Sequence, residues 1–414
     1  MNLSQKSRRS LLFFVLATLP GVCLAYQTTS NHSYIKNSNF AGNYVMEIGG
    51  DLDSKFFHSN SYSLFKFESD LSLDLRLYHV AGGVLKYGLD IRHDLSGQYP
   101  RETTYYLFIV GYLGKIEIGT TRDATENLKI GALPLSISPN ATGSSFAKHV
   151  EFPTGYGNAL FEPTTLMNQN FGFTNGQSME GAWNSTRYLD KISYYSPEFF
   201  GFQLGLSITP NISDTLSKNA VFGKLISKSE KTELKDLGCV TSAALNYIGN
   251  ILDISLAASI AFEFNSRTPT WIIPFKGKKY EKKSSSLAAE FQSWEVGLSL
   301  SYFGLTIAGS YGQNITSIEE DLSQKLNLEE TIGGGYTTFG ASYEIGSFGI
   351  GAVFFNSEYN GNTIKTTNYE LKRKIAKNLT LYLQFIDYQY KFEIDDEKES
   401  GEEFAAAIGL LLNF

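Results

Sequence analysis

Apolar and polar residues alternate with a period of two along most of the chain. Between Phe65 and Leu77 the odd positions carry Phe, Leu and one Ser, whereas the even positions carry Lys, Glu, Asp, Ser and Arg. The segments 252–264, 294–302 and 404–414 repeat this pattern. Successive side chains of a strand point to opposite faces, so the alternation predicts strands with one apolar face. No segment of comparable length has a helical period, and the sequence predicts an all-β fold.

Sixteen strands follow from this pattern, and the lengths of their connections alternate. The predicted strands lie at 43–57, 62–80, 84–95, 103–112, 115–121, 186–197, 201–210, 238–248, 251–264, 293–303, 305–313, 335–345, 348–355, 367–376, 379–392 and 402–414. After the first hairpin, tight turns alternate with long connections, which are predicted at 96–102, 122–185, 211–237, 265–292, 314–334, 356–366 and 393–401. An even strand number with all short turns at one end is typical of an outer-membrane barrel.

Backbone hydrogen bonding explains why such strands would close into a ring. No water inside a bilayer can satisfy free N–H and C=O groups, so a spanning sheet has no open edge. Lipid would contact the apolar faces, and a barrel of about 16 strands leaves a water-filled bore. The alternative is a large soluble β-sandwich, but its interior would need large apolar side chains. The opposite faces here are charged or carry Gly, Ala and Ser. We therefore predict a transmembrane antiparallel up-and-down β-barrel.

Two positions depart from the simple pattern. In the strand 379–392 the apolar residues switch from odd to even positions after Phe385, which predicts a β-bulge near Ile386. Arg373 falls on the predicted lipid face. It either reaches the periplasmic interface or lies in a subunit contact, and the pattern does not choose between them.

The first 25 residues have the composition of a cleaved secretory signal. A basic start at 6–9 precedes an apolar stretch at 11–19, and a small-residue cleavage site follows at 23–25. A lipoprotein signal would require Gly or Ala before Cys23, whereas Val22 stands there. The remaining alternative, a membrane anchor, is disfavoured because the stretch is too short to span a bilayer. Residues 26–414 are thus expected to form a single barrel domain.

Composition and charge exclude several classes of protein. The 414 residues are 42% hydrophobic and 14% aromatic, which is too apolar for intrinsic disorder. After residue 25 no apolar run of about 18 residues occurs, which excludes a helical membrane protein. The 35 basic and 42 acidic side chains argue against a nucleic-acid partner. Removing the leader would change the formal charge from −7 to −10 and leave Cys239 without an intrachain disulfide partner.

Several motifs resemble those of one family. The sequence TRYLDKISYYSPEFFGF at 186–202 resembles the strand-turn-strand signature of Gram-negative general porins, with its Tyr-x-Ser/Thr-Pro turn and aromatic-Gly-Phe restart. GKIEIG at 114–119 resembles the strand before their long third loop, and the terminal Phe414 resembles an outer-membrane assembly signal. The resemblance implies a homotrimer of 16-stranded barrels in the outer membrane of a Gram-negative cell. Each barrel would carry passive diffusion of small hydrophilic solutes and ions.

The same resemblance implies several partners. They are the lipid bilayer, lipopolysaccharide, and the outer-membrane assembly machinery, which would recognise Phe414. The basic run 276–283 and the acidic run 395–403 are expected on external loops. There they would contact lipopolysaccharide phosphates directly or through divalent cations, or they would simply be solvated loop tips.

Charged residues at alternate positions are the candidate pore lining. They are Lys66, Glu68, Asp70, Asp74, Arg76, Lys86, Asp90 and Arg92. The segment 122–185 matches the family's third loop in position and is expected to fold partly into the lumen or to form a short helix. Its candidate constriction residues are Arg122, Asp123, Glu126, Glu151 and Glu162. Opposite charges across a narrow pore would create a transverse field, although each could also be a solvated wall position without a special role.

The sequence offers no motif for catalysis or for a cofactor. The five His residues lack metal-ligand spacing, and 333–335 is a Gly run without the Lys of a phosphate loop. We therefore predict a non-enzymatic channel without a metal or cofactor, and its acidity predicts a mild preference for cations. Two alternatives are a substrate-selective channel, which would show an aromatic ladder or one sign of charge along the lumen, and an outer-membrane enzyme or adhesin.

Overall fold

One antiparallel sheet accounts for most of the computed structural model. The structure describes residues 35–40, 44–59, 66–82, 84–94, 103–136, 190–210, 233–235, 239–265, 270–272, 289–318, 331–359, 362–394 and 397–414. The principal strands are β2 (Tyr44–Ser59), β3 (Lys66–Ala81), β4 (Leu85–Asp94), β5 (Thr103–Gly111), β6 (Gly114–Thr120), β7 (Asp190–Tyr195), β8 (Phe202–Thr209), β10 (Val240–Ile251), β11 (Ile254–Asn265), β13 (Ala289–Tyr302), β14 (Leu305–Ile318), β15 (Thr331–Ile345), β16 (Phe348–Tyr359), β17 (Asn362–Ala376), β18 (Leu379–Ile394) and β19 (Glu397–Asn413).

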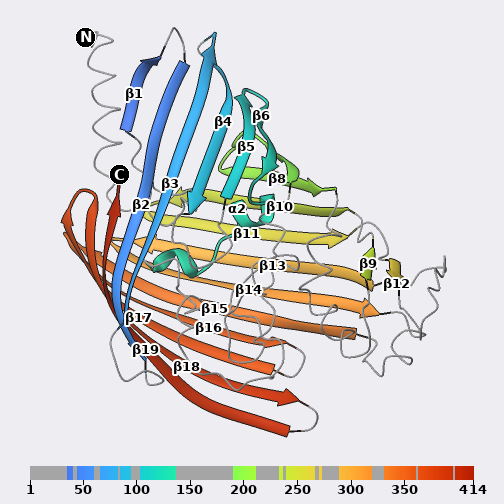
Figure 1. Cartoon of the computed structure of the whole chain (residues 1–414), viewed down its shortest axis with the longest axis vertical. Helices are drawn as coiled ribbons and strands as arrows, with labels where there is room; N and C mark the ends of the chain where they lie inside the picture. Colours follow the sequence, from blue (N-terminus) through green and yellow to red (C-terminus); the bar gives the residue numbers. More distant parts are fainter. Residues whose placement is uncertain are drawn as a thin grey trace.

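These strands close into a ring (Figure 1). Each pairs with its neighbour along the chain, β8 pairs with β10, and β19 returns to pair with β2 from Ala405 to Asn413. The sheet has 17 strands, and the first of them, β1 (Ile35–Phe40), lies along β2 beyond the end of β19. The other sixteen form the closed barrel in the described part of the chain, as predicted. Beyond β19, the N–H of Phe414 donates to the carbonyl of Gly50 at 3.0 Å, and the N–H of Gly50 donates back at 2.8 Å.

The two faces of the strands differ as the alternation predicted. On β3, Phe67 is 58% exposed on the outside, whereas Glu68 beside it is 5% exposed on the inside. Most of the exposed large apolar side chains of the described strands are outward residues of this kind. An exposed apolar band around a closed sheet requires a hydrocarbon environment.

Two predicted long connections are wrong. β16 continues to Tyr359 and β17 begins at Asn362, while β18 and β19 leave only residues 395–396 between them. The acidic run from residue 397 onward therefore belongs to β19 and is not part of an external loop. The outward side chains here are polar, for example Glu358 and Lys365, so apolar alternation gives no signal, although the backbone ladder continues.

The predicted bulge near Ile386 is also wrong. β18 stays in register with β17 and with β19 through Ile386, and the register shift in this region lies between Lys374 and Ala376. Ile386 is 1% exposed and faces inward, as do Tyr388 and Phe392. The apolar residues switch from odd to even positions because the inner face of this strand becomes apolar toward its external end. The strand itself remains regular.

Arg373 lies on the outer face near the short turn 377–378. Its guanidinium carbon is 5.1 Å from the centre of the Phe348 ring on β16. An Arg near a strand end can lay its stem on apolar surface and send its charge to the interface. This placement agrees with the interfacial alternative.

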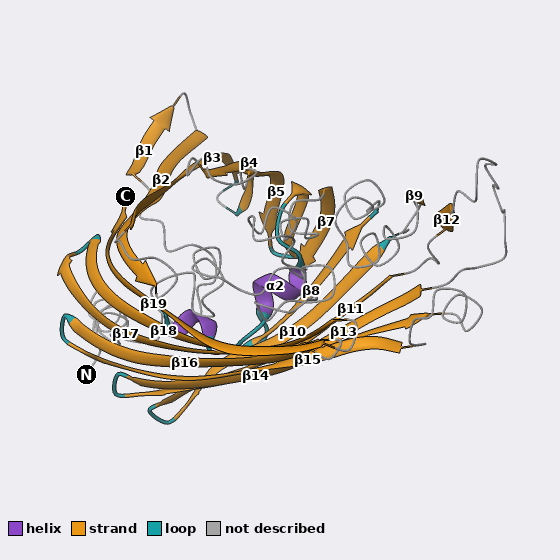
Figure 2. Cartoon of the chain, turned by 60° about the horizontal axis from the view of Figure 1, so that its bottom comes forward, coloured by secondary structure: helices purple, strands orange, loops and turns teal. Residues whose placement is uncertain are grey.

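A short helix and a 3-10 turn lie inside the ring. Figure 2 shows α2 (Ala124–Leu128) between the two sides of the barrel. The 3-10 helix η1 (Leu133–Leu135) contacts β15 and β16. A separate two-stranded sheet joins β9 (Glu233–Lys235) and β12 (Thr270–Ile272). Within the ranges given above, no helix is long and apolar enough to cross a membrane.

The apolar band gives a prediction about the depth at which a charge is tolerated. Leu298 lies on the outer face within β13, and Gln389 lies on the outer face near the external end of β18. Leu298→Arg should cost about 2–4 kcal/mol of folding free energy in a bilayer, whereas Gln389→Arg should cost about 0–1 kcal/mol. Denaturant titrations of folding into phospholipid vesicles measure both values, and equal costs would contradict the placement of the band.

Candidate pore lining and constriction

The inner faces of β2, β3 and β4 carry a dense set of charges. The strands pair so that Glu47 lies opposite Arg76, which in turn lies opposite Asp90. Between the strand ends this set, called here the charged wall, has seven carboxylates and three cations. They are Glu47, Asp51, Asp53, Glu68, Asp70, Asp74 and Asp90, and Lys55, Arg76 and Arg92.

Lys55 is buried among three of these carboxylates. Its Nζ lies 3.1 Å from Asp70 Oδ2, 3.5 Å from Asp53 Oδ2 and 3.8 Å from Glu68 Oε2. The Tyr382 hydroxyl of β18 donates to Asp53 Oδ1 at 2.7 Å and ties the cluster across the seam of the barrel. A buried ammonium needs close counter-charges to offset its desolvation. Lys55 therefore has three carboxylate neighbours, although a single carboxylate would balance its charge.

The two arginines have the same arrangement. Arg76 contacts Asp90 Oδ2 through Nη2 at 2.6 Å and Glu47 Oε2 through Nη1 at 3.8 Å. Arg92 lies 3.6 Å from Asp51 Oδ2 and 3.7 Å from Asp74 Oδ1. Both side chains are about one-third exposed, so they meet the lumen. Because each cation of the charged wall has two or three carboxylate partners, the wall keeps a surplus of negative charge.

Residues 121–136, called here the inner segment, run along the opposite part of the bore. Asp123 caps α2, because its Oδ1 accepts from the Glu126 N–H at 2.8 Å and from the Thr125 hydroxyl at 2.5 Å. Arg122 Nε lies 3.6 Å from Glu126 Oε1 one turn later. The Asp123 carboxylate is buried, and its structural use is to start the helix.

Polar side chains of the wall hold the inner segment in place. The Ala124 N–H donates to Ser207 Oγ on β8 at 2.7 Å, and the Ile130 N–H donates to Ser259 Oγ on β11 at 2.8 Å. At the far end the Ser136 hydroxyl donates to Glu370 Oε2 on β17 at 2.5 Å. The inner segment therefore crosses the inside of the barrel from β8 to β17.

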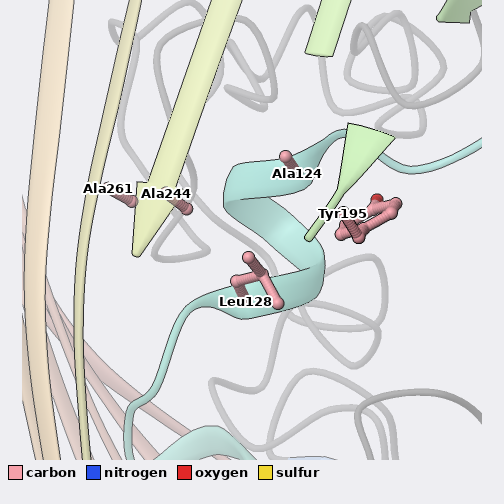
Figure 3. Close-up of a cluster of buried hydrophobic side chains, with 5 residues drawn as sticks. All are labelled: Ala124, Leu128, Tyr195, Ala244 and Ala261. Atoms are coloured by element: carbon pink, nitrogen blue, oxygen red, sulfur yellow. The ribbon is translucent and has the colours of Figure 1, made fainter. Parts of the chain in front are cut away.

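Small wall residues make room for this crossing. In Figure 3, Ala124 and Leu128 of α2 pack against Ala244, Ala261 and Tyr195 of the wall. A Cβ on Gly297 of β13 would collide with the Ile130 carbonyl, and one on Gly340 of β15 would lie 3.2 Å from the Ala132 Cβ. The run of small inward residues on these strands is thus the seat of the inner segment. The lumen has two unlike sides, a charged wall on β2–β4 and a covered wall on β8–β17.

The structure brings together most of the predicted pore residues. Glu68, Asp70, Asp74, Arg76, Asp90 and Arg92 all belong to the charged wall. Lys66 lies at the external end of β3, and Lys86 lies at the periplasmic end of β4 with Nζ 5.8 Å from the centre of the Tyr78 ring. Of the predicted constriction residues, Arg122, Asp123 and Glu126 lie in the inner segment, and Glu151 and Glu162 fall outside the described residues.

Sequence reasoning missed the β2 members of the charged wall. Glu47, Asp51, Asp53 and Lys55 all occupy odd positions, between outward residues such as Leu52 and Phe56. Pairing β2 with β3 would have placed three of them, Glu47, Asp53 and Lys55, opposite predicted residues. No group of three or more His, Cys, Asp or Glu side chains in the described ranges could hold a metal ion.

Comparisons with known proteins agree with this architecture. A family model described as Gram-negative porin matches residues 14–404. The chain belongs to the Gram-negative porin family. It is accordingly an outer-membrane β-barrel whose bore is a diffusion channel. No curated protein sequence matches the chain.

Solved structures of low identity share the fold of this porin. An anion-selective porin from Comamonas acidovorans is 13% identical with a TM-score of 0.57, and the match covers 90% of this chain and 100% of that one. The outer-membrane channel DcaP of Acinetobacter baumannii is 10% identical with a TM-score of 0.58 and coverages of 91% and 99%. OmpT of Vibrio cholerae, in a trimer form, is 12% identical with a TM-score of 0.53 and coverages of 90% and 100%.

The seat of the inner segment can be tested with one methyl group. Gly297→Ala should push the Ile130 carbonyl into the bore, lower the single-channel conductance and cost about 1–3 kcal/mol of stability by overpacking. Gly351→Ala on β16 is the matched control, because its Cβ would meet only ordinary contacts, at 3.4 Å or more. Planar-bilayer recordings compare the two variants. Unchanged conductance in a folded Gly297→Ala channel would show that the segment is not seated there.

Proposed function

We propose that this porin lets small hydrophilic solutes and ions diffuse passively and that it prefers cations to anions. The observation that carries the preference is the composition of the charged wall, where seven carboxylates surround three cations. A lumen lined by an excess of one charge concentrates counter-ions, because low-dielectric walls focus the field into the bore. The formal charge of the chain, −7, has the same sign.

The mixture of charge signs favours a general channel over a narrowly selective one. Cations and carboxylates of the charged wall are paired side by side, so a permeating solute meets neither a ladder of one sign nor a fixed ligand set. The relative from Comamonas acidovorans is named as anion-selective. At 13% identity it supports the fold and gives no argument about the charges of this lumen.

The remaining expectations form part of the same proposal. A leader of residues 1–25 would direct export, and Phe414, whose backbone pairs with Gly50, would be recognised by the assembly machinery. The basic run 276–283 lies outside the described residues, and contact with lipopolysaccharide is proposed for the external end of the barrel. The family is one of channels, and we propose no catalytic activity for this member.

Cation preference predicts the sign of a potential. In a KCl gradient the zero-current potential of the wild-type channel should show excess permeability to K⁺, and should shrink at high salt, because the Debye length falls from about 10 Å at 0.1 M to about 3 Å at 1 M. The double variant Asp51→Asn, Asp70→Asn should reduce this potential, because it removes two negative charges from the wall. Arg92 keeps Asp74 as a partner, and Lys55 keeps Asp53 and Glu68.

Glu402→Gln is the control for that double variant. Glu402 is exposed near the external end of β19, away from the charged wall, so its neutralisation should leave the potential unchanged. Planar-bilayer measurements decide between the outcomes. A wild-type potential of the opposite sign would refute the proposed preference.

We also propose that the barrel assembles as a homotrimer. Support comes from membership of the porin family and from a similar fold that is titled as a trimer form. The detergent-extracted protein should therefore have three times the mass of one chain by light scattering, and should dissociate on boiling in sodium dodecyl sulfate. Conductance should close in three equal steps. A monomeric mass with single-step closure would contradict trimer formation.

A further inference from the structure

Bulky apolar side chains stand at the tips of several short turns. The turn from β5 to β6 has Tyr112 and Leu113 at its tip, and the turn from β7 to β8 has Phe199 and Phe200. The turn from β10 to β11 has Leu252, and the turn from β13 to β14 has Phe303. These residues, called here the apolar rim, include Leu252 at 93% exposure, Leu113 at 85% and Phe200 at 83%. Their four hairpins are successive neighbours around the barrel. The apolar rim is therefore continuous along one arc of the periplasmic end.

Backbone geometry makes these residue choices costly. Phe200, Leu252 and Phe303 have φ values of 50°, 57° and 45°, in the left-handed region. Gly or Asn adopts this region more readily than a bulky side chain, so turn formation alone would favour them. Three turns nonetheless place a large apolar residue at this strained position. The strain indicates that the side chains have a use outside the turn itself.

The remaining periplasmic turns in the described ranges are different. The turn from β3 to β4 contains Gly82 and Val84, the turn from β15 to β16 is Gly346-Ser347, and the turn from β17 to β18 is Lys377-Asn378. Apart from Val84, which is 38% exposed, these described tip residues are small or polar. On the same arc Arg373 places a cation on the outer face close to the turn. The periplasmic rim is thus apolar on one arc and polar on the other.

The apolar rim continues the band that faces lipid. On β8 the outward residues Phe202, Leu204, Leu206 and Ile208 lead to Phe200, and on β13 Leu298, Leu300 and Tyr302 lead to Phe303. No charged residue interrupts either series. Glu198 and Asp253 adjoin the tips, where carboxylates would reach the headgroup level.

We propose that the apolar rim is inserted into the periplasmic leaflet of the outer membrane, below the level at which Arg373 meets the interface on the other arc. Aromatic and Leu side chains enter the boundary of headgroups and acyl chains and gain apolar burial there. The barrel then sits asymmetrically, with turns of the β5–β14 arc in lipid and turns of the β15–β18 arc in water. This inference rests on the outer-membrane location and does not depend on the ion preference of the bore.

Depth-dependent quenching tests the proposal directly. Trp183, Trp271 and Trp294 are first replaced by Phe, and single tryptophans are then introduced as Leu252→Trp, Phe303→Trp, Ser347→Trp and Asn378→Trp. Each variant is reconstituted in phosphatidylcholine vesicles with plain or brominated acyl chains. Bromine should quench the two rim variants at least about twofold more than the two control variants, because only side chains within the boundary meet acyl bromines. Aqueous acrylamide should quench the two sets in the reverse order.

Equal acrylamide quenching of all four variants, without an effect of bromine, would overturn the proposal. In that case a periplasmic protein or a second copy of the chain would be the partner that covers the apolar rim. Neither outcome changes the expected channel conductance. A second variant, with Phe200, Leu252 and Phe303 all changed to Asn, relieves the strained positions. It should fold normally in detergent yet insert more slowly into vesicles. Insertion at the wild-type rate or faster would also refute insertion of the rim.

Discussion

Closure of the backbone hydrogen-bond ladder is the constraint on which the rest of the structure depends. The return of β19 onto β2, extended by the reciprocal bonds of Phe414 and Gly50, removes the last strand edge of the ring. In hydrocarbon each unpaired backbone group would cost several kcal/mol, so an open ring is not a stable intermediate state of the spanning protein. Closure also fixes which side chains face inward, and therefore fixes the composition of the bore.

The inside of the ring is divided between two tasks that need different residues. From β8 to β17 the inner segment lies against small wall residues such as Gly297 and Gly340, and it bonds to Ser207, Ser259 and the carboxylate of Glu370. On β2–β4 the inward positions carry a much denser set of charges. Small residues on one arc allow the inner segment to lie flat against the wall. The charges on the other arc then determine the electric field in the lumen.

Alternation predicted this architecture well, and its failures have physical causes. All sixteen predicted strands occur, because a band in lipid forces one face of each strand to be apolar. The pattern failed at 356–366 and 393–401, where outward side chains beyond the band are polar, and at Ile386, where an inward face is apolar. Asp123, a candidate constriction residue, lies in the inner segment, and its additional use as a helix cap depends on a local turn that a period of two does not describe. Long-range contacts such as Tyr382 with Asp53 across the seam could not be read from either strand alone.

The buried Lys55 affects both the stability of the barrel and the electric field of the bore. A buried ion pair is a weak source of stability, because desolvation offsets most of the attraction, but removal of one partner costs about 3–5 kcal/mol. Three carboxylates around one ammonium therefore do little to strengthen the barrel, but the shared ammonium holds them in fixed positions. Fixed charges produce a stronger field than mobile ones, since they need not reorganise as an ion passes. Lys55, Arg76 and Arg92 thus hold their carboxylate partners in fixed positions, which leaves a surplus of negative charge beside the bore.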